Sequence, residues 1–293
     1  EIVKHMPKKA HPMDVARTVV SVMGLEDKDT RNNSPTANMR KAIRIFAKTP
    51  TAIAAFFRAR KGKNVIPPKK GLGFSENFFY MCFGKIPNKE IVKAFDVSLI
   101  LYAEHSFNVS TFTARTITSS LSDIHSAITG AIGSLKGPLH GGANEEVMHM
   151  MNKIKKPENA LKWINKALDN KDVVMGFGHR VYKKGDSRVP TMEKYFKKVS
   201  KIQKDKKLYK IYDLVKNVMI EKKNIHPNVD YPTGPTYHLM GFDTDFFTPI
   251  FVLSRITGWS AHIMEQHTAN KLIRPLSKYS GEQHRKVMLL NQR

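Results

Sequence analysis

The apolar residues of the chain recur mainly at the spacing of an α-helix. In residues 88–105 the positions that fall on one helical face are Ile91, Val92, Phe95, Leu99, Leu101 and Tyr102. Residues 50–60 and 248–266 carry similar stripes. Alternation of apolar and polar positions is nearly absent, and neither Asn-Gly nor Asp-Gly, the dipeptides of tight hairpins, occurs. The pattern predicts an all-α fold, with at most a short extended piece at 172–175.

Glycine and proline divide this helical pattern at four places. They cluster at 61–73, 137–142, 176–185 and 226–234. The last three of these predicted loops also carry candidate chemistry. The chain has 293 residues, 41% of them apolar, which is enough for one or two domains.

No apolar stretch approaches the ~20 residues that a transmembrane helix needs. The longest, at 246–253 and 128–135, are short and contain Pro or Gly. We therefore predict a globular protein that does not cross a membrane. Cys82 is the only cysteine, which excludes an intramolecular disulfide and a multi-cysteine zinc site. The first residue is Glu1 rather than Met, so we expect that N-terminal segments are missing.

The charge is strongly positive, because 49 Lys and Arg face 25 Asp and Glu, which gives +24. Such a charge would attract nucleic acid, but it also suits a coenzyme A thioester with its phosphate groups. The lysines that crowd residues 194–223 are interleaved with an apolar helical stripe, and we interpret them as a solvated helix face. No nucleic-acid-binding motif accompanies them, so a non-catalytic nucleic-acid-binding protein is the weaker alternative.

Residues 137–146, Gly-Pro-Leu-His-Gly-Gly-Ala-Asn-Glu-Glu, place His140 on a glycine-flanked turn just before a predicted helix. The dipole at the N-terminus of that helix would keep the imidazole neutral, and a neutral histidine can donate a hydrogen bond to a carbonyl. Such a donor stabilises the enolate that forms when a proton is removed next to a thioester. Taken alone, the motif is more often a helix-capping loop.

Two further loops offer polar groups. Asn-Val-Asp-Tyr-Pro at 228–232 sets Asp230 in a proline-bounded loop, where a carboxylate can act as a base, although a turn-forming aspartate is the commoner role. Gly-Phe-Gly-His-Arg at 176–180 lacks the third glycine of a dinucleotide-binding fingerprint, but its backbone groups suit an adenine ring. The polar residues at its end and behind it are His179, Lys183, Lys184 and Arg188.

A metal site is not predicted. His262 and His267 lie five residues apart, so on a helix their side chains would point about 140° apart, unlike the pairs that hold zinc.

Together these segments resemble the citrate synthase family, in the same order and at compatible spacing. The residues that carry the resemblance are Ala-Glu-His-Ser-Phe-Asn-Val-Ser-Thr-Phe from 103, Gly-Pro-Leu-His-Gly-Gly-Ala-Asn from 137, Gly-Phe-Gly-His-Arg-Val-Tyr from 176 and Asn-Val-Asp-Tyr from 228. The similarity runs from 11–14 to 273–275, nearly the whole chain, and is greatest to the bacterial-type branch that includes 2-methylcitrate synthases. Family members normally begin further upstream, so an inactive truncated relative is an alternative to an active enzyme.

The resemblance implies an all-α fold with a large domain, 1–139 and 241–293, and a small mobile domain, 140–240, that closes over the substrates. It implies a homodimer and an acyltransferase activity, the condensation of acetyl-CoA or propionyl-CoA with oxaloacetate to release CoA and citrate or 2-methylcitrate. No cofactor is implied beyond the acyl-CoA substrate. We expect a cytoplasmic location, with the mitochondrial matrix as the alternative.

The resemblance also implies roles for single residues. His140 would stabilise the thioester enol, Asp230 would take the α-proton, and His179 would donate to the ketone of oxaloacetate. Ser110 would orient His140, and Asn108 would lie with it behind the residues that contact the substrates. The implied oxaloacetate ligands are His105, His179, Arg188, Arg255 and, from the neighbouring subunit, Arg274. The implied CoA-binding residues are Val174, Met175, Gly176, Phe177, Gly178 and, for phosphate, Lys183.

Overall fold

The computed structural model describes residues 1–182 and 184–293, and within them the chain is helical. It contains the α-helices α1 (Pro12–Glu26), α2 (Pro35–Ala59), α3 (Phe74–Phe83), α4 (Lys89–Tyr102), α5 (Val109–Ser119), α6 (Ile124–Leu135), α7 (Ala143–Ile154), α8 (Pro157–Asp169), α9 (Val189–Ile202), α10 (Lys206–Lys223), α11 (Asp230–Leu239) and α12 (Phe247–Thr268). Short 3-10 helices are η1 (Ile2–His5), η2 (Thr244–Phe246) and η3 (Leu290–Gln292). The one β-type pairing among the described residues is an isolated antiparallel bridge between Phe177 and Pro227. The predicted all-α fold is confirmed, and residues 172–175 form no strand.

The predicted helices are present, with shifted ends. The stripe at 88–105 becomes α4, which Asn88 caps by accepting a hydrogen bond from Glu90 N at 2.8 Å. The stripe at 50–60 is the second half of α2, which continues through Pro50. The stripe at 248–266 is α12.

The predicted loop at 226–234 is wrong in its second half. Asp230 is the first residue of α11, and Pro232 lies in the first turn of that helix. Proline is tolerated there because the first N–H groups of a helix have no intrahelical acceptor. Asp230 is therefore held at the start of a helix and not within a flexible turn.

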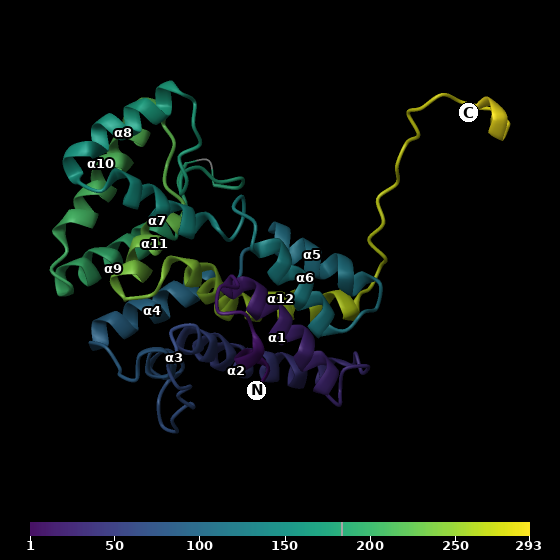
Figure 1. The fold of residues 1–293 in the computed structure, drawn as a ribbon, viewed down its shortest axis with the longest axis horizontal. Helices are drawn as coiled ribbons and strands as arrows, with labels where there is room; N and C mark the ends of the chain where they lie inside the picture. The colour runs from purple at the N-terminus through teal and green to yellow at the C-terminus, as the bar shows by residue number, and fades with distance from the viewer. Residues whose placement is uncertain (183) are drawn as a thin grey trace.

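Helix α12 is the central element of the larger group of helices. Every residue from Phe247 to Ile256 is buried, which is typical of a helix segment that the protein encloses. It packs against α1, α2, α4, α5 and α6 (Figure 1). No helix in the described part of the chain is long and apolar enough to cross a membrane.

Helices α7 to α11 pack mainly on one another and form a second group at one end of the molecule (Figure 1). Within this group α11 lies against α7 and α9, and α10 lies against α8. The two groups meet where α4 contacts α9 and where α12 contacts α7. The division into domains at 1–139 with 241–293 and at 140–240 stays a prediction.

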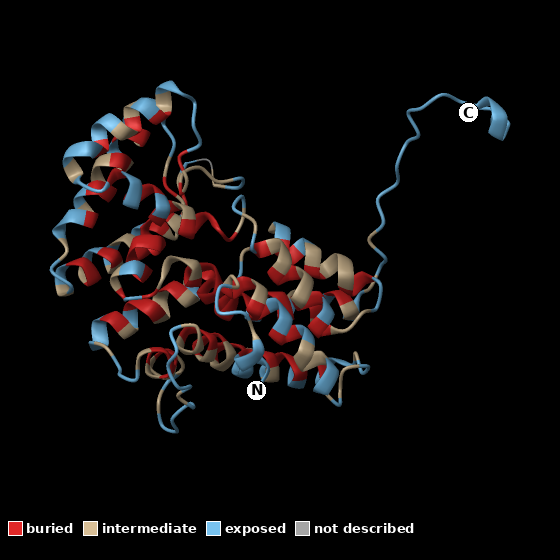
Figure 2. Ribbon diagram, in the orientation of Figure 1, coloured by how far each residue is buried: buried red, intermediate tan, exposed pale blue. Residues whose placement is uncertain are grey.

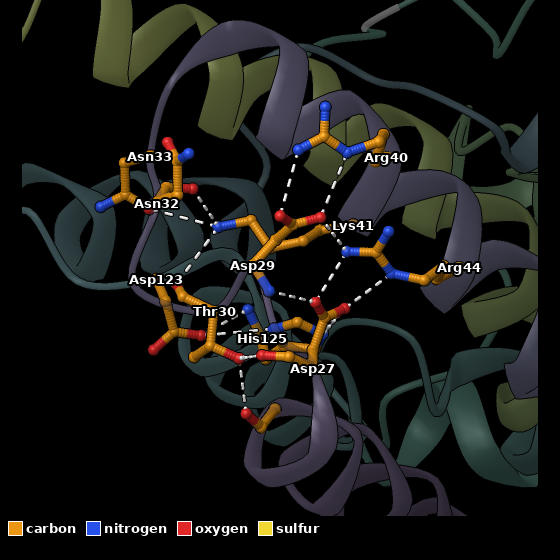
Figure 3. A network of polar contacts seen from close by, with 11 residues as sticks. Asp27, Asp29, Thr30, Asn32, Asn33, Arg40, Lys41, Arg44, Asp123 and His125 are labelled. Carbon is orange, nitrogen blue, oxygen red and sulfur yellow. Dashed lines mark hydrogen bonds and ion pairs between the residues drawn. The ribbon is translucent and has the colours of Figure 1, made fainter.

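A polar network fastens the connection between α1 and α2 (Figure 3). Arg44 of α2 donates to both carboxylate oxygens of Asp27, through Nε at 2.8 Å and Nη2 at 2.6 Å. The fully buried ammonium of Lys41 donates to the carbonyls of Thr30 at 3.2 Å and Asn32 at 2.7 Å. A buried ammonium is tolerated only where such acceptors replace its water. The connection is thus held by charge-assisted hydrogen bonds to α2.

Beyond α12 the chain leaves the body of the molecule as an extended segment (Figure 1). Almost all of it is exposed (Figure 2). Arg274 lies in this segment.

Helix α11 approaches α7 closely at Gly234. A Cβ atom at Gly234 would lie 2.5 Å from the carbonyl oxygen of Asn144, nearer than a side chain can approach. Asn144 is in the first turn of α7, and Gly234 is in the second turn of α11. The contact therefore holds the beginnings of these two helices side by side, close to His140 and Asp230.

We expect Gly234→Ala to lower the free energy of unfolding by roughly 1–3 kcal/mol, because the helices must move apart to admit the methyl group. The better helix propensity of alanine offsets at most about 1 kcal/mol of this cost. Denaturant unfolding measures the change. Gly73→Ala is the matched control, because its Cβ would meet only the end of the Glu76 side chain, at 3.5 Å. Equal stability of the two variants would contradict the expectation.

Candidate active site

His140 lies on the turn before α7, and its ring reaches the N-terminus of α5. Its Nε2 atom accepts a hydrogen bond from the backbone N–H of Ser110 at 3.2 Å and lies 2.8 Å from Ser110 Oγ. Because a backbone N–H can only donate, Nε2 is an acceptor, and the neutral ring carries its proton on Nδ1. His140 therefore presents an N–H donor at Nδ1.

Ser110 is itself fixed by three neighbours. Its Oγ accepts from Trp259 Nε1 at 3.1 Å and lies 2.8 Å from both Asn108 Oδ1 and His140 Nε2, the two acceptors that compete for its one hydroxyl proton. Asn108 caps α5 by accepting from Thr111 N at 3.1 Å. The sequence pointed to the helix that follows His140 as the source of a dipole, but the hydrogen bond to the ring comes from the N-terminus of α5.

The surroundings of His140 disfavour its positive charge. Burial lowers the pKa of His140 to about 4, and the positive charges of Arg255 and His105 act in the same direction. The positive end of the α5 dipole adds to this effect. His140 is therefore neutral at pH 7.

The pKa of Asp230 is shifted in the opposite direction, upward. Burial raises the pKa of Asp230 to about 6, while the hydrogen bond from Tyr102 and the charge of Arg188 lower it. The Tyr102 hydroxyl donates to Asp230 Oδ1 at 2.5 Å. At pH 7 the group is a carboxylate with a basicity well above that of an ordinary aspartate, which suits a general base.

Arg255 projects from α12, and only 1% of its surface is exposed to solvent. Its Nε donates to the carbonyl of Tyr102 at 2.7 Å, and its guanidinium lies 4.7 Å from the centre of the Phe251 ring. Its Nη1 atom has no hydrogen-bond partner among the described residues. Burial lowers the pKa of Arg255 to about 10, so it remains charged at pH 7.

Helix α12 covers the C-terminal end of α4. Besides Arg255, Ser254 Oγ donates to Leu99 O, and Gly258 N donates to Ala103 O at 3.1 Å. The last carbonyls of a helix lack intrahelical partners, so these donors satisfy them, and the negative end of the α4 dipole faces the guanidinium. A Cβ on Gly258 would lie 2.5 Å from Ala103 O, which explains glycine at this position.

Arg188 uses two of its three guanidinium nitrogens in an ion pair within its own chain. It forms a bidentate pair with buried Asp186, through Nε at 2.9 Å and Nη2 at 2.7 Å. Asp186 Oδ2 also accepts from Val229 N at 3.0 Å and so ties Arg188 to the start of α11. Among the described residues, the one hydrogen bond that Nη1 makes is a long one, of 3.5 Å, to Leu101 O.

His105 and His179 lie edge to face, with ring centres 5.0 Å apart, and both rings contact Tyr182. Nδ1 of His179 accepts from the backbone N–H groups of Val181 at 3.0 Å and Tyr182 at 3.2 Å. The neutral ring therefore carries its proton on Nε2. Burial lowers the pKa of His105, and the charges of Arg188, His179 and Arg255 lower it further.

The predicted adenine loop is pinned to the segment before α11. Asn228 N donates to Gly176 O at 2.9 Å, and Asn228 Nδ2 donates to Gly178 O at 3.0 Å. Gly176 and Gly178 have φ of 85° and 75°, the region that favours glycine. Of the other predicted loop residues, Val174 is buried and Met175 and Phe177 are half-buried. Lys183 lies outside the described residues.

The structure thus gathers most of the predicted residues. His105, His140, His179, Arg188, Asp230 and Arg255 lie close enough for their charges to shift one another's pKa values. Arg274, in the exposed segment after α12, makes no hydrogen bond or ion pair with this cluster within the described residues. The cluster combines two guanidinium groups, a carboxylate whose pKa is raised, and two imidazoles that each present an N–H.

Three supporting residues were missed by the sequence reasoning. The hydrogen bond of Tyr102 to Asp230 was not predicted, because the sequence pattern placed Tyr102 in the apolar stripe at 88–105. Asp186 stands two residues before Arg188, and this acid–base pair in a glycine-containing loop was a usable signal. Trp259 carries an indole N–H, which usually finds a partner when buried.

We expect Tyr102→Phe to raise the pKa of Asp230 above its value of about 6, because the lost hydrogen bond favours the charged carboxylate. The carboxyl carbon shift of Asp230, followed by NMR against pH, measures the change. A pKa that stays the same or falls would contradict the assigned hydrogen bond. Ser98→Ala, which removes a hydroxyl bonded to Tyr237 at 2.9 Å, is the control for removing a nearby buried hydroxyl.

Comparison with known proteins shows which family the chain resembles. The family model described as "Citrate synthase, C-terminal domain" matches residues 1–276. The 2-methylcitrate synthase of Mycobacterium tuberculosis (strain H37Rv) is 54% identical over 96% of this chain and 71% of its own length. The citrate synthase of Mycolicibacterium smegmatis is 52% identical over 97% and 76%.

A solved structure gives the same result for the fold. The citrate synthase of Thermoplasma acidophilum, solved as a ternary complex with carboxymethyl coenzyme A and oxaloacetate, superposes with a TM-score of 0.86. The match has 32% sequence identity and covers 99% of this chain and 78% of that one. The chain belongs to the citrate synthase family.

Proposed function

We propose that this protein condenses a short acyl-CoA with oxaloacetate and releases CoA and a tricarboxylate. The observation that carries the proposal is the buried guanidinium of Arg255, whose Nη1 has no hydrogen-bond partner among the described residues. A buried charge left without a partner is costly, whereas a bound carboxylate would compensate it. Arg188 Nη1 and the two histidines beside it provide donors for a second carboxylate and a ketone.

The residues account for each proton. Asp230 takes a proton from the carbon next to the thioester, and His140 Nδ1–H donates to the thioester oxygen as the enol forms. The enol carbon attacks the ketone of oxaloacetate, whose oxygen takes a proton from His179. As the thioester carbonyl re-forms, the enol proton returns to His140. Water then adds its hydroxyl group to the acyl carbon and its proton to the departing CoA sulfur, which gives free CoA and citrate or 2-methylcitrate, and the proton on Asp230 replaces the one that His179 gave. A positioned donor at a developing oxyanion is worth about 3–4 kcal/mol.

The condensation needs no metal and no redox cofactor, because the attacking electron pair comes from the C–H bond that Asp230 breaks. The CoA moiety would lie on the 174–178 loop, with Lys183 as a candidate phosphate ligand. Closure of residues 140–240 over the substrates would exclude water from the enol. The pinning of this loop to the start of α11 supports a link between CoA binding and the position of Asp230.

The acyl group is proposed to be acetyl or propionyl, since relatives of both names match this chain at similar identity. One methylene in an apolar pocket changes the binding free energy by about 1–3 kcal/mol, so we expect both thioesters to react at different rates. Family membership favours this activity over nucleic-acid binding as an explanation of the positive charge. The bacterial sources of the relatives support a cytoplasmic location.

We expect the protein to release CoA when oxaloacetate is added with acetyl-CoA or propionyl-CoA, as measured by thiol titration. His140→Ala and Asp230→Asn should each lower kcat by roughly 10²–10⁴-fold, the usual contribution of a positioned acid or base. His149→Ala is the matched control, because His149 is an exposed histidine of α7 outside the site. Wild-type rates in both site variants would exclude the mechanism, and absence of thiol release from the wild type would favour an inactive relative.

We further propose a homodimer in which Arg274 of each subunit completes the site of its neighbour. The position of Arg274 in an extended segment that leaves the body of the chain supports this arrangement (Figure 1). Planar guanidinium groups suit carboxylates bidentately, so a further arginine would match the negative charge of oxaloacetate.

Mixing of two inactive variants tests the shared site. Arg274→Ala and Asp230→Asn should each be nearly inactive alone, but a mixed dimer would hold one site that contains both intact residues. After subunit exchange at equal amounts, about a quarter of the wild-type activity should return, because half the dimers are mixed and each has one intact site. Failure to recover activity in dimers shown to be mixed would contradict the sharing of Arg274.

A further inference from the structure

A pocket of about 430 Å³ lies among helices α7, α10 and α11, away from the residues of the active site. It is lined by Met148, Met151, Asn152, Lys155, Lys156, Asp205, Lys207, Leu208, Ile211 and His238. Its volume falls in the range of sites that hold small organic ligands, about 300–1,000 Å³.

The lining separates into an apolar part and a charged part. Met148, Met151, Leu208 and Ile211 are buried and provide the apolar part. The charged part has three exposed lysines and one aspartate, so its charge is positive. None of these lysines forms an ion pair with a described residue, and Asp205 is engaged in capping α10 through Leu208 N at 2.8 Å.

Lys155 is held in an unfavourable backbone conformation at this pocket. It follows the last residue of α7 with φ of 65° and ψ of −46°, where glycine is favoured and other residues are strained. A glycine at this helix end would be the more stable choice. The chain therefore carries a lysine where its backbone alone would favour glycine, and that lysine lines the pocket.

We propose that this pocket binds a small amphipathic anion, with an apolar ring or acyl body on the methionine and leucine surface and a phosphate or carboxylate group at the lysines. The lysine stems extend the apolar surface, while their ammonium groups form a shared anion site. Asn152 and His238 add hydrogen-bonding groups for the polar end of the ligand.

The pocket is distinct from the reaction centre. Helix α7 begins just after His140 and ends just before Lys155, and its 12 residues separate the two ends. At a rise of about 1.5 Å per residue this distance is about 18 Å. Helix α11 likewise begins at Asp230 and carries His238 near its end. A ligand in the pocket and the substrates can therefore be bound at the same time.

Fluorescence titration with 8-anilinonaphthalene-1-sulfonate, which joins an apolar body to an anion, tests the site in the full chain. Saturating CoA and oxaloacetate are present throughout to occupy the active site. We expect binding by the wild type, and weaker binding of the uncharged analogue N-phenyl-1-naphthylamine. Absence of sulfonate binding under these conditions would overturn the proposal.

Variants separate the role of Lys155 in binding from its role in folding. Lys155→Gly should weaken binding of the sulfonate about three- to fivefold, the worth of one exposed charge pair, while raising the unfolding temperature by relieving strain. Lys171→Gly is the matched control, because Lys171 has a φ of 58° and does not line the pocket. It should raise the unfolding temperature and leave the affinity unchanged. Unchanged affinity in both Lys155→Gly and Lys207→Gln would contradict the site.

Competition identifies the anionic group of the ligand. Displacement of the sulfonate by phenyl phosphate supports a phosphate ligand, and displacement by benzoate supports a carboxylate ligand. Displacement by neither would contradict binding of an amphipathic anion at this pocket.

Discussion

The central constraint on this structure is a guanidinium held inside the protein. Arg255 is almost completely buried, and removing such a charge from water costs several kcal/mol unless other groups compensate. The compensation comes from the last carbonyl of α4, from the negative end of that helix and from the Phe251 ring. It is incomplete at Nη1, which has no hydrogen-bond partner among the described residues, and the proposed function assigns a substrate carboxylate to this atom.

The same constraint arranges the rest of the site. Because α12 must cover the end of α4, Gly258 and Ser254 bring the chain at Ala103 and Leu99 into contact with α12. The loop that follows places His105 and the N-terminus of α5 near the guanidinium. The charge of Arg255 then helps to keep His140 neutral while it favours ionised Asp230. One buried cation therefore lowers the pKa of both groups, which favours neutral His140 and ionised Asp230.

The sequence allowed the all-α class to be predicted and the candidate residues of the site to be singled out, because helical periodicity is local and glycine-flanked histidines stand out. His140 and Asp230 were found in this way, but the helix start at Asp230 was not, since the prolines beside it suggested a loop. The hydrogen bond from Tyr102 could not be found, because it joins residues that are far apart along the chain. The support of His140 by α5, and the close approach of α7 and α11 at Gly234, likewise depend on tertiary packing that no local pattern reveals.

Hydrogen exchange at the acyl carbon tests the central claim most directly, because it isolates proton removal from carbon–carbon bond formation. The measurement follows uptake of deuterium from D2O into the methyl group of acetyl-CoA by mass spectrometry, with malate, which lacks the ketone, in place of oxaloacetate. The account predicts exchange faster than in buffer by on the order of 10²-fold or more, because base and donor act together on the thioester. Exchange at the rate of buffer alone, with both ligands bound, would contradict it.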